Sequence, residues 1–157
     1  MKVSDLMSRN PTTCSPNATI AEAARLMDEH DCGCLPVAEQ QSAPRVMGVI
    51  TDRDIATRAV ALGRGPDTPV REVMSNDPSC CHEDDNVKTV EQIMAERQVR
   101  RVLVVDQAGC CVGVVAQADL ARSVPARELA KTVEKISDPS VTPRRDTRVG
   151  VHPAQFR

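Results

Sequence analysis

Apolar residues recur at intervals of three and four positions in two separate stretches of the chain, a spacing typical of the buried face of an α-helix. The two stretches place on one face Ile20, Ala23, Ala24 and Met27, and then Val87, Val90, Ile93 and Met94. Thr19 is followed three residues later by Glu22, which is the sequence of a capping box. The pattern therefore predicts two amphipathic helices that begin near residues 20 and 87.

Two short apolar runs follow each predicted helix and are typical of buried strands: CLPVA and RVMGVI in the first stretch, RVLVVD and CCVGVV in the second. A second helix is then expected over DRDIATRAVALG, ending near Gly63 and Gly65, and over QADLARSV, ending before Pro125. An extended segment that contains proline precedes each first helix, NPTTCSP or DPSCCHE. The predicted element order is β-α-β-β-α, twice.

The two stretches are copies of one another. Met7 and Met74 match at an offset of 67 residues, and the phrase GVITDRDI returns as GVVAQADL at an offset of 65. The first copy thus carries two extra residues, which fit the polar loop AEQQSAPR because exposed loops tolerate insertions. Both methionines are expected in the core, whereas His30 and His82 are expected at the surface.

One copy, of roughly 55 residues, buries too little surface to be comfortably stable alone. We therefore expect an α+β fold in which the two copies pack sheet to sheet as a pseudo-two-fold pair, with one shared core and two symmetry-related clefts. The expected organisation is a first motif at 3–63, a linker at 64–69, a second motif at 70–125, a C-terminal helix at 126–137 and a flexible tail at 138–157.

Composition narrows the function. The net charge of −2 gives no electrostatic case for nucleic-acid or membrane binding, and with one Phe and no Trp or Tyr a flat ligand must lie against aliphatic side chains and backbone. The first residues lack the apolar run of a signal peptide, so a cytoplasmic location is expected. The chain has no nucleophile elbow, Walker loop or HExxH motif, so an enzyme is not expected.

The seven cysteines are Cys14, Cys32, Cys34, Cys80, Cys81, Cys110 and Cys111. The main interpretation is that they are small fillers of a core without aromatic residues. The alternative is a zinc-binding or redox-responsive protein, in which Cys80, Cys81 and His82 would meet a further cysteine such as Cys32 or Cys34.

The stretch from Val3 to Val124 resembles a tandem pair of CBS (cystathionine-β-synthase) domains, also called a Bateman module, of the stand-alone bacterial kind. The resemblance lies in the order LMSRNP, TIAEAARLMDEHD, LPV and GVITDRDI, which returns as VMSNDP, VKTVEQIMAERQVRRVLVV and GVVAQADL. The resemblance implies a regulatory protein that binds AMP, ADP, ATP, NAD or S-adenosylmethionine between the motifs. It also implies a homodimer that acts on another, unidentified protein and needs no cofactor. The alternative to a nucleotide sensor is a ligand-free dimerising scaffold or stress protein.

A carboxylate in the first turn of a helix suits the two hydroxyls of a ribose, because charge-assisted hydrogen bonds are strong. Asp54 and Asp119 occupy such positions; Thr51 adds a hydroxyl that Ala116 cannot supply. Carried over from the family, the first cleft would use Val49, Thr51, Arg53, Asp54, Ser79, Val99, Arg100 and Arg101. The second cleft would use Thr12, Cys32, Gly33, Cys34, Val114, Ala116 and Asp119.

Only the first cleft combines a hydroxyl, a carboxylate and a matching cation, because Arg101 corresponds to Cys34 in the other copy. We therefore expect a ligand to occupy the first cleft preferentially. The plainer alternative is that Asp54, Asp119 and Thr51 only cap helices, and that Arg100 and Arg101 are ordinary surface charges.

Overall fold

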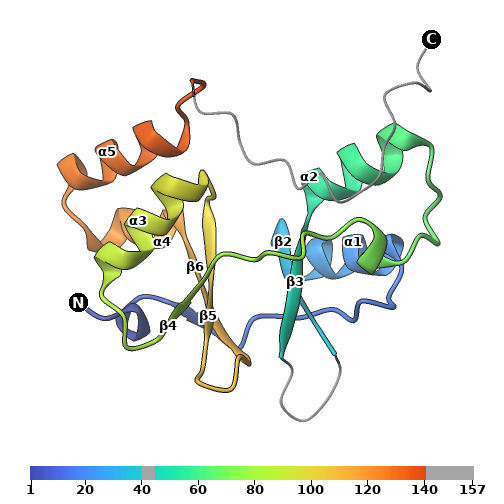
Figure 1. The fold of residues 1–157 in the computed structure, drawn as a ribbon, viewed down its shortest axis with the longest axis horizontal. Coiled ribbons are helices and arrows are strands. Elements are labelled where there is room, and N and C mark those ends of the chain that lie inside the picture. The colour runs from blue at the N-terminus through green and yellow to red at the C-terminus, as the bar shows by residue number, and fades with distance from the viewer. Residues whose placement is uncertain (40–44, 141–157) are drawn as a thin grey trace.

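The computed structural model describes residues 1–39 and 45–140. Two halves lie side by side, each with a β-sheet toward the middle of the molecule and helices on the outer side (Figure 1). The first half contains α1 (Ile20–Glu29), β2 (Cys34–Ala38), β3 (Val46–Thr51) and a helical segment of α2 (Asp52–Asp54), η2 (Ile55–Ala59) and η3 (Val60–Leu62). The second half contains β4 (Cys80–His82), α3 (Val87–Arg97), β5 (Arg101–Val105), β6 (Cys111–Ala116), α4 (Gln117–Ser123) and α5 (Ala126–Ile136).

The predicted α+β fold and the pseudo-two-fold pair of motifs are confirmed. The β2 and β3 strands form one antiparallel pair, and β1 (Ser8–Arg9), β6, β5 and β4 form the other sheet in that order. The helix expected after Pro125 is α5, which packs on α3. From residue 141 on, the expected flexible tail lies outside the described residues.

The helix starts follow the local sequence. Thr19 and Glu22 form the predicted capping box: the Glu22 amide donates to Thr19 Oγ1 at 3.1 Å and the Thr19 amide donates to Glu22 Oε2 at 2.7 Å. In the second copy Asn86 caps α3, since its side-chain oxygen accepts from the Lys88 amide at 3.0 Å. No helix within the described ranges has the length and apolar composition needed to cross a membrane.

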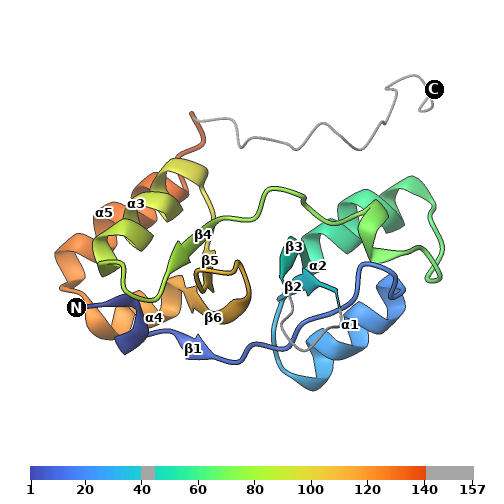
Figure 2. The same ribbon diagram turned by 60° about the horizontal axis from the view of Figure 1, so that its bottom comes forward.

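The segment that leads into each repeat packs on the opposite half, so the expectation of one shared core is wrong. Val3 and Met7 belong to the core of the second half, whereas Val73 and Met74 belong to that of the first. The chain crosses between the halves twice, once before α1 and once before β4 (Figure 2). Because each half takes in the leading segment of the other copy, two cores form that neither repeat could complete alone.

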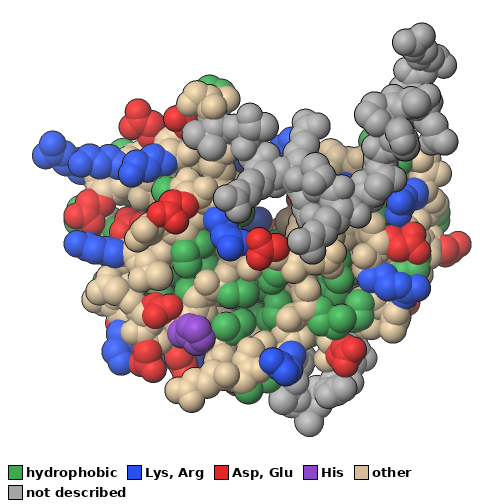
Figure 3. Space-filling view, viewed as in Figure 1, with side chains coloured by type: hydrophobic (Ala, Val, Ile, Leu, Met, Phe, Trp, Pro, Cys, Tyr) green, Lys and Arg blue, Asp and Glu red, His purple; other side chains and the backbone are tan. Residues whose placement is uncertain are grey.

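A second layer of buried side chains joins the two sheets. Side chains alternate between the faces of a strand, so Pro36 and Leu103 point away from the cores that their neighbours fill. Both are nevertheless buried, since the other half covers them. Apolar side chains gather where the halves meet (Figure 3). The predicted packing of sheet on sheet is therefore present, as a contact between two cores.

Pro36 also accounts for a difference between the copies. In the second half the Leu103 amide donates to the Ser79 carbonyl at 2.8 Å, next to the parallel pair of β4 and β5. The matching position in the first half is Pro36, which has no amide proton to donate. The extended segment around Cys14 accordingly forms a single bridge to Val37 where the second copy has a strand.

The second helix of the first copy is less regular than expected. Residues 52–62 are helical throughout, but η2 has π-helical hydrogen bonds and η3 is a 3-10 turn. The segment ends at Gly63, whose φ of 70° is the left-handed conformation that glycine adopts easily. The matching α4 is an ordinary helix that ends before Pro125, as predicted.

In each copy, the leading segment of the other copy passes directly over the glycine that opens the repeated phrase, Gly48 or Gly113. A Cβ atom at Gly48 would collide with the Ser75 carbonyl oxygen, and one at Gly113 would lie 2.6 Å from Met7 Sδ. Backbone hydrogen bonds between Val49 and Ser75, at 3.0 and 2.9 Å, hold the crossing before β4 in place. The phrase therefore needs glycine in both copies for close approach.

We expect Gly48→Ala to lower the free energy of unfolding by about 2–3 kcal/mol, because the clash is with backbone that cannot move aside. Gly113→Ala should cost about 1 kcal/mol, since the flexible Met7 side chain can shift. Gly65→Ala is the control: a Cβ atom there meets nothing within 4 Å. Urea unfolding measures all three, and a Gly48 variant as stable as the Gly65 variant would contradict the close-approach argument.

Candidate functional site

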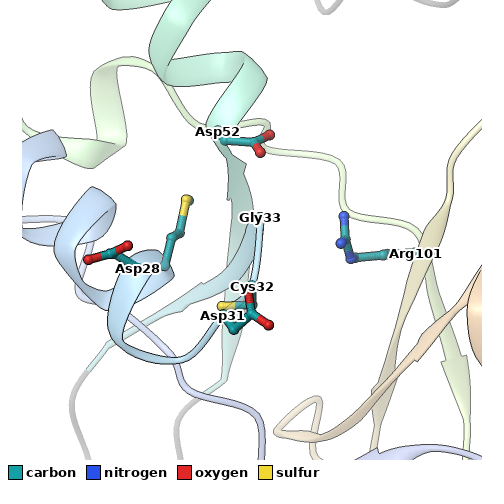
Figure 4. A pocket seen from close by; sticks show the side chains of 7 residues that line it. Asp28, Asp31, Cys32, Gly33, Asp52 and Arg101 are labelled. Atoms are coloured by element: carbon teal, nitrogen blue, oxygen red, sulfur yellow. The ribbon is translucent and has the colours of Figure 1, made fainter.

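An open hollow of about 500 Å³ lies at the seam between the halves. Its first-half wall comes from the end of α1, the turn into β2 and the start of α2, and Arg101 at the start of β5 projects from the second half (Figure 4). The lining residues are Met27, Asp28, Asp31, Cys32, Gly33, Asp52 and Arg101. A hollow of this size falls in the range of small-molecule sites.

Backbone contacts hold the first-half wall together. The Asp52 amide donates to the Gly33 carbonyl at 3.1 Å, and the Asp52 carboxylate lies so close to Gly33 that a Cβ atom there would sit 2.8 Å from it. The same link recurs in the second half, where the Gln117 amide donates to the Arg100 carbonyl at 2.9 Å. The strand-to-helix turn therefore has one geometry in both copies.

Asp54 is fixed beside this wall by the turn that it caps. Its Oδ2 accepts from the Thr51 amide at 2.9 Å, and the Thr51 hydroxyl accepts from the Asp54 amide at 3.1 Å. Both residues therefore do cap the helix, as the plainer alternative held. A carboxylate has about four lone-pair sites, so Asp54 can still accept from a ligand.

Arg58 holds the other oxygen of Asp54. Its Nε lies 3.6 Å from Asp54 Oδ1, and its Nη1 donates to the carbonyls of Val73 and Met74 and to Ser75 Oγ at 3.3–3.4 Å. This guanidinium links the carboxylate to the segment that crosses between the halves. Arg58 lies in the π-helical turn η2, and such turns are frequent at functional sites.

Asp119 is the structural twin of Asp54. Its Oδ2 accepts from the Ala116 amide at 2.8 Å, but Ala116 has no oxygen to complete the box. Its Oδ1 accepts from Arg122, which is 76% exposed and makes no link to a crossing segment. The two carboxylates thus share a backbone position and differ in their surroundings.

Other residues expected in the first cleft are spread over the seam. Val49 pairs with Ser75 of the crossing segment, and Ser79 is buried next to β5. Val99 packs against the core of the second half. Arg53 and Arg100 are exposed.

Residues expected in the second cleft divide between the halves. Cys32 and Gly33 line the same hollow as Arg101, which was expected in the first cleft. Cys34 lies beside it, and Thr12 is partly buried in the segment before α1. Val114 pairs with Ser8 on β6, away from these residues. The structure thus brings members of both expected sets to one hollow.

Charged groups from both halves influence the pKa of the Cys34 thiol. Burial raises the pKa of the Cys34 thiol to about 12, the Arg101 guanidinium acts in the opposite direction, and Cys32 and Asp54 raise it further. Cys34 therefore remains a neutral thiol at physiological pH. Arg101 and Asp54, from opposite halves, thus act in opposite directions on the pKa of this thiol.

The candidate metal residues do not converge. Cys80, Cys81 and His82 are consecutive on β4, so Cys81 points into the core of the second half while His82 is exposed. Within residues 1–39 and 45–140 no group of three His, Cys, Asp or Glu side chains is arranged to hold a metal ion. All seven cysteines lie in these ranges and are free thiols.

Three carboxylates of the hollow were not among the expected site residues: Asp28, Asp31 and Asp52. A local signal was present, because Asp28 and Glu29 fill the last turn of α1 without a basic residue. Carboxylates at the negative end of a helix are unfavourable, and such local conflicts concentrate at functional sites. Asp52 gave no comparable signal.

The exchanged leading segments and the hollow at the seam define the class of protein: a two-repeat α+β module with a site of small-molecule size. The chain belongs to the CBS-domain family, since residues 3–61 and 70–126 each match the family model described as "CBS domain". The resemblance inferred from the sequence is thereby confirmed.

Two relatives show how far the similarity extends. The CBS domain-containing protein YhcV of Bacillus subtilis is 44% identical over 128 residues, which cover 82% of this chain and 89% of that protein. The L-aspartate semialdehyde sulfurtransferase of Methanocaldococcus jannaschii is 32% identical over 120 residues, but these cover 76% of this chain and only 22% of that enzyme.

Two solved structures share the fold. Hypoxic Response Protein I with two coordinated zinc ions has a TM-score of 0.69 at 32% identity and covers 80% of this chain and 100% of that one. The CBS domain pair of protein MJ0100, in complex with 5′-methylthioadenosine and S-adenosylmethionine, has a TM-score of 0.70 at 31% identity. The match covers 78% of this chain and 94% of that one. Together the comparisons support a regulatory, ligand-binding CBS protein.

We expect Arg58→Met to lower the free energy of unfolding by about 1–2 kcal/mol, because it removes the ion pair with Asp54 and the charge-assisted hydrogen bonds to the crossing segment. Arg122→Met is the matched control and should change stability by less than about 0.5 kcal/mol, since exposed ion pairs contribute little. Urea unfolding compares them. Equal losses in the two variants would contradict the link through Arg58.

We expect stability to fall above about pH 9, the ordinary pKa of the thiols. Burial raises the pKa of Cys14 to about 11 and that of Cys81 to about 12. The folded state therefore keeps thiol protons that the unfolded chain releases, so stability is complete below pH 9 and is lost as pH rises toward 11. The slope should reach about 1.4 kcal/mol per pH unit per thiol.

Urea unfolding between pH 7 and pH 10 tests this slope. The double variant Cys14→Ala and Cys81→Ala should be less stable at every pH but should show a shallower decline. An unchanged slope in the double variant would rule out these thiols as its source.

Proposed function

We propose that this chain is a regulatory module that binds an adenosine-containing ligand in the hollow at the seam. The observation that carries the proposal is the hollow itself, in which Arg101 of the second half faces the strand-to-helix turn of the first half. Asp52 of this turn lines the hollow, and the Asp54 carboxylate caps the same turn. A carboxylate suits the two ribose hydroxyls, and a guanidinium suits an anionic group elsewhere on the ligand. The adenosine compounds bound to the MJ0100 domain pair support the ligand class.

The lining suits a base that does not need aromatic stacking. Met27 and Cys32 supply apolar and polarisable surface, and Gly33 leaves its backbone accessible. The Thr51 hydroxyl accepts one hydrogen bond and, among the described residues, donates none, so its proton is available to the ligand. Ala116 offers no such group, which makes the two copies unequal.

A ligand at this seam would act on the module as a whole. It would contact the first half and Arg101 together, and Asp54 is tied through Arg58 to the segment that crosses between the halves. A ligand shifts such a module only by binding its two states unequally. Within this proposal the chain is a cytoplasmic homodimer without catalysis of its own, and its occupancy controls an unidentified partner protein.

Asp54→Asn should weaken the binding of an adenosine ligand about tenfold or more, because the variant keeps the helix cap but loses the charge that faces the ribose. Asp119→Asn is the matched control, since it removes the same charge from the same backbone position in the other copy. It should change affinity less than about twofold.

A thermal-shift screen with AMP, ADP, ATP, NAD, S-adenosylmethionine and 5′-methylthioadenosine selects the probe, and calorimetry on both variants measures the losses. A saturating ligand at about 100 times its dissociation constant adds about 2.7 kcal/mol to stability. If none of the six compounds raises the melting temperature, the proposal of an adenosine site fails and the ligand-free scaffold remains. Equal losses in both variants would contradict preferential use of the first copy.

A further inference from the structure

The hollow carries more negative than positive charge. Asp28, Asp31 and Asp52 line it together with one cation, Arg101. Across the described ranges, none of these three carboxylates forms an ion pair within 4.0 Å of a basic side chain. Elsewhere, on the face seen in Figure 3, acidic and basic side chains are interspersed.

The α1 helix adds to this negative potential. Its C-terminal end, which carries partial negative charge, leads directly into the hollow through Asp31, Cys32 and Gly33. No basic residue lies in its last turn to offset that charge. Acidic residues in this position work against helix stability.

The matching positions in the second half lack this charge. Asp28, Asp31 and Asp52 correspond to Ala95, Gln98 and Gln117, and Gly33 corresponds to the cation Arg100. Asp31 and Gln98 adopt the same left-handed backbone, with φ of 47° and 51°, so the turn does not demand a carboxylate. The Gln98 side-chain amide (Nε2) instead donates to the carbonyls of Lys135 and Asp138, at 3.3 and 3.0 Å, where α5 ends.

These carboxylates are not arranged for a metal ion, since within residues 1–39 and 45–140 no three acidic or other ligating side chains converge. Figure 4 shows the Asp31 and Asp52 carboxylates on the side that faces Arg101, whereas the Asp28 carboxylate points away from Arg101. A lining with carboxylates on one wall and a guanidinium on the other suits a group that carries positive and negative charge together. It disfavours a chain of phosphates, because every added negative charge meets the Asp side.

We propose that the hollow selects an adenosine whose 5′ substituent is cationic and bears an amino acid, in preference to 5′-phosphates. The positive groups of such a ligand would lie toward Asp31 and Asp52, and its carboxylate toward Arg101. This inference rests on the proposed function and narrows it to one ligand class. S-adenosylmethionine, with a sulfonium and an ammonium group, is the probe of that class.

Calorimetry compares S-adenosylmethionine, neutral 5′-methylthioadenosine, AMP, and ATP with and without magnesium. We expect S-adenosylmethionine to bind about tenfold more tightly than AMP or either form of ATP. The double variant Asp31→Asn and Asp52→Asn should lose about tenfold in affinity for S-adenosylmethionine and should bind AMP as well as or better than the wild type. Glu29→Gln is the control, because Glu29 carries the same charge at the same helix end but does not line the hollow.

The outcomes separate the two proposals. Binding of AMP or magnesium-ATP as tight as that of S-adenosylmethionine would overturn the charge selection and leave the adenosine site standing. The charge selection is equally overturned if the double variant keeps the wild-type ratio of affinities, or if Glu29→Gln changes that ratio as much as the double variant does. Absence of binding by every compound would overturn both proposals.

Discussion

The exchange of leading segments between the halves is the constraint on which the rest of the structure depends. Each core is completed by apolar residues from the start of the other repeat, and each crossing runs against a strand where only glycine leaves room. Neither repeat can bury its own apolar face without the other, so the halves fold as one object. The seam between them is a product of this exchange.

A shared seam lets residues from distant parts of the sequence meet. Arg101 reaches a hollow whose other walls come from the end of α1 and the start of α2, both much earlier in the chain. Arg58 then connects the capping carboxylate of Asp54 to the crossing segment itself. The hollow and the link through Arg58 thus lie at the same strand-to-helix turn, because Asp52 lines the hollow and Asp54 pairs with Arg58.

Duplication supplied two equivalent backbones, and substitution has since made them different. The turn into the first strand and the strand-to-helix link are the same in both copies, down to the left-handed residue at Asp31 and Gln98. The side chains at these positions are acidic in the first copy and neutral or basic in the second. In the second copy the end of α5 also lies over this position, because the Gln98 side chain donates to the carbonyls of Lys135 and Asp138.

The sequence by itself determined the elements and their pairing into repeats, because helix periodicity, capping residues and the repeated phrase are local signals. It also indicated the family and the position of Thr51 and Asp54 at the start of a helix. Only the tertiary structure decided that the cores are exchanged and that Cys32, Gly33 and Arg101 share one hollow with three carboxylates. Those facts depend on contacts across the seam, and no local pattern specifies which side chains two folded surfaces bring together.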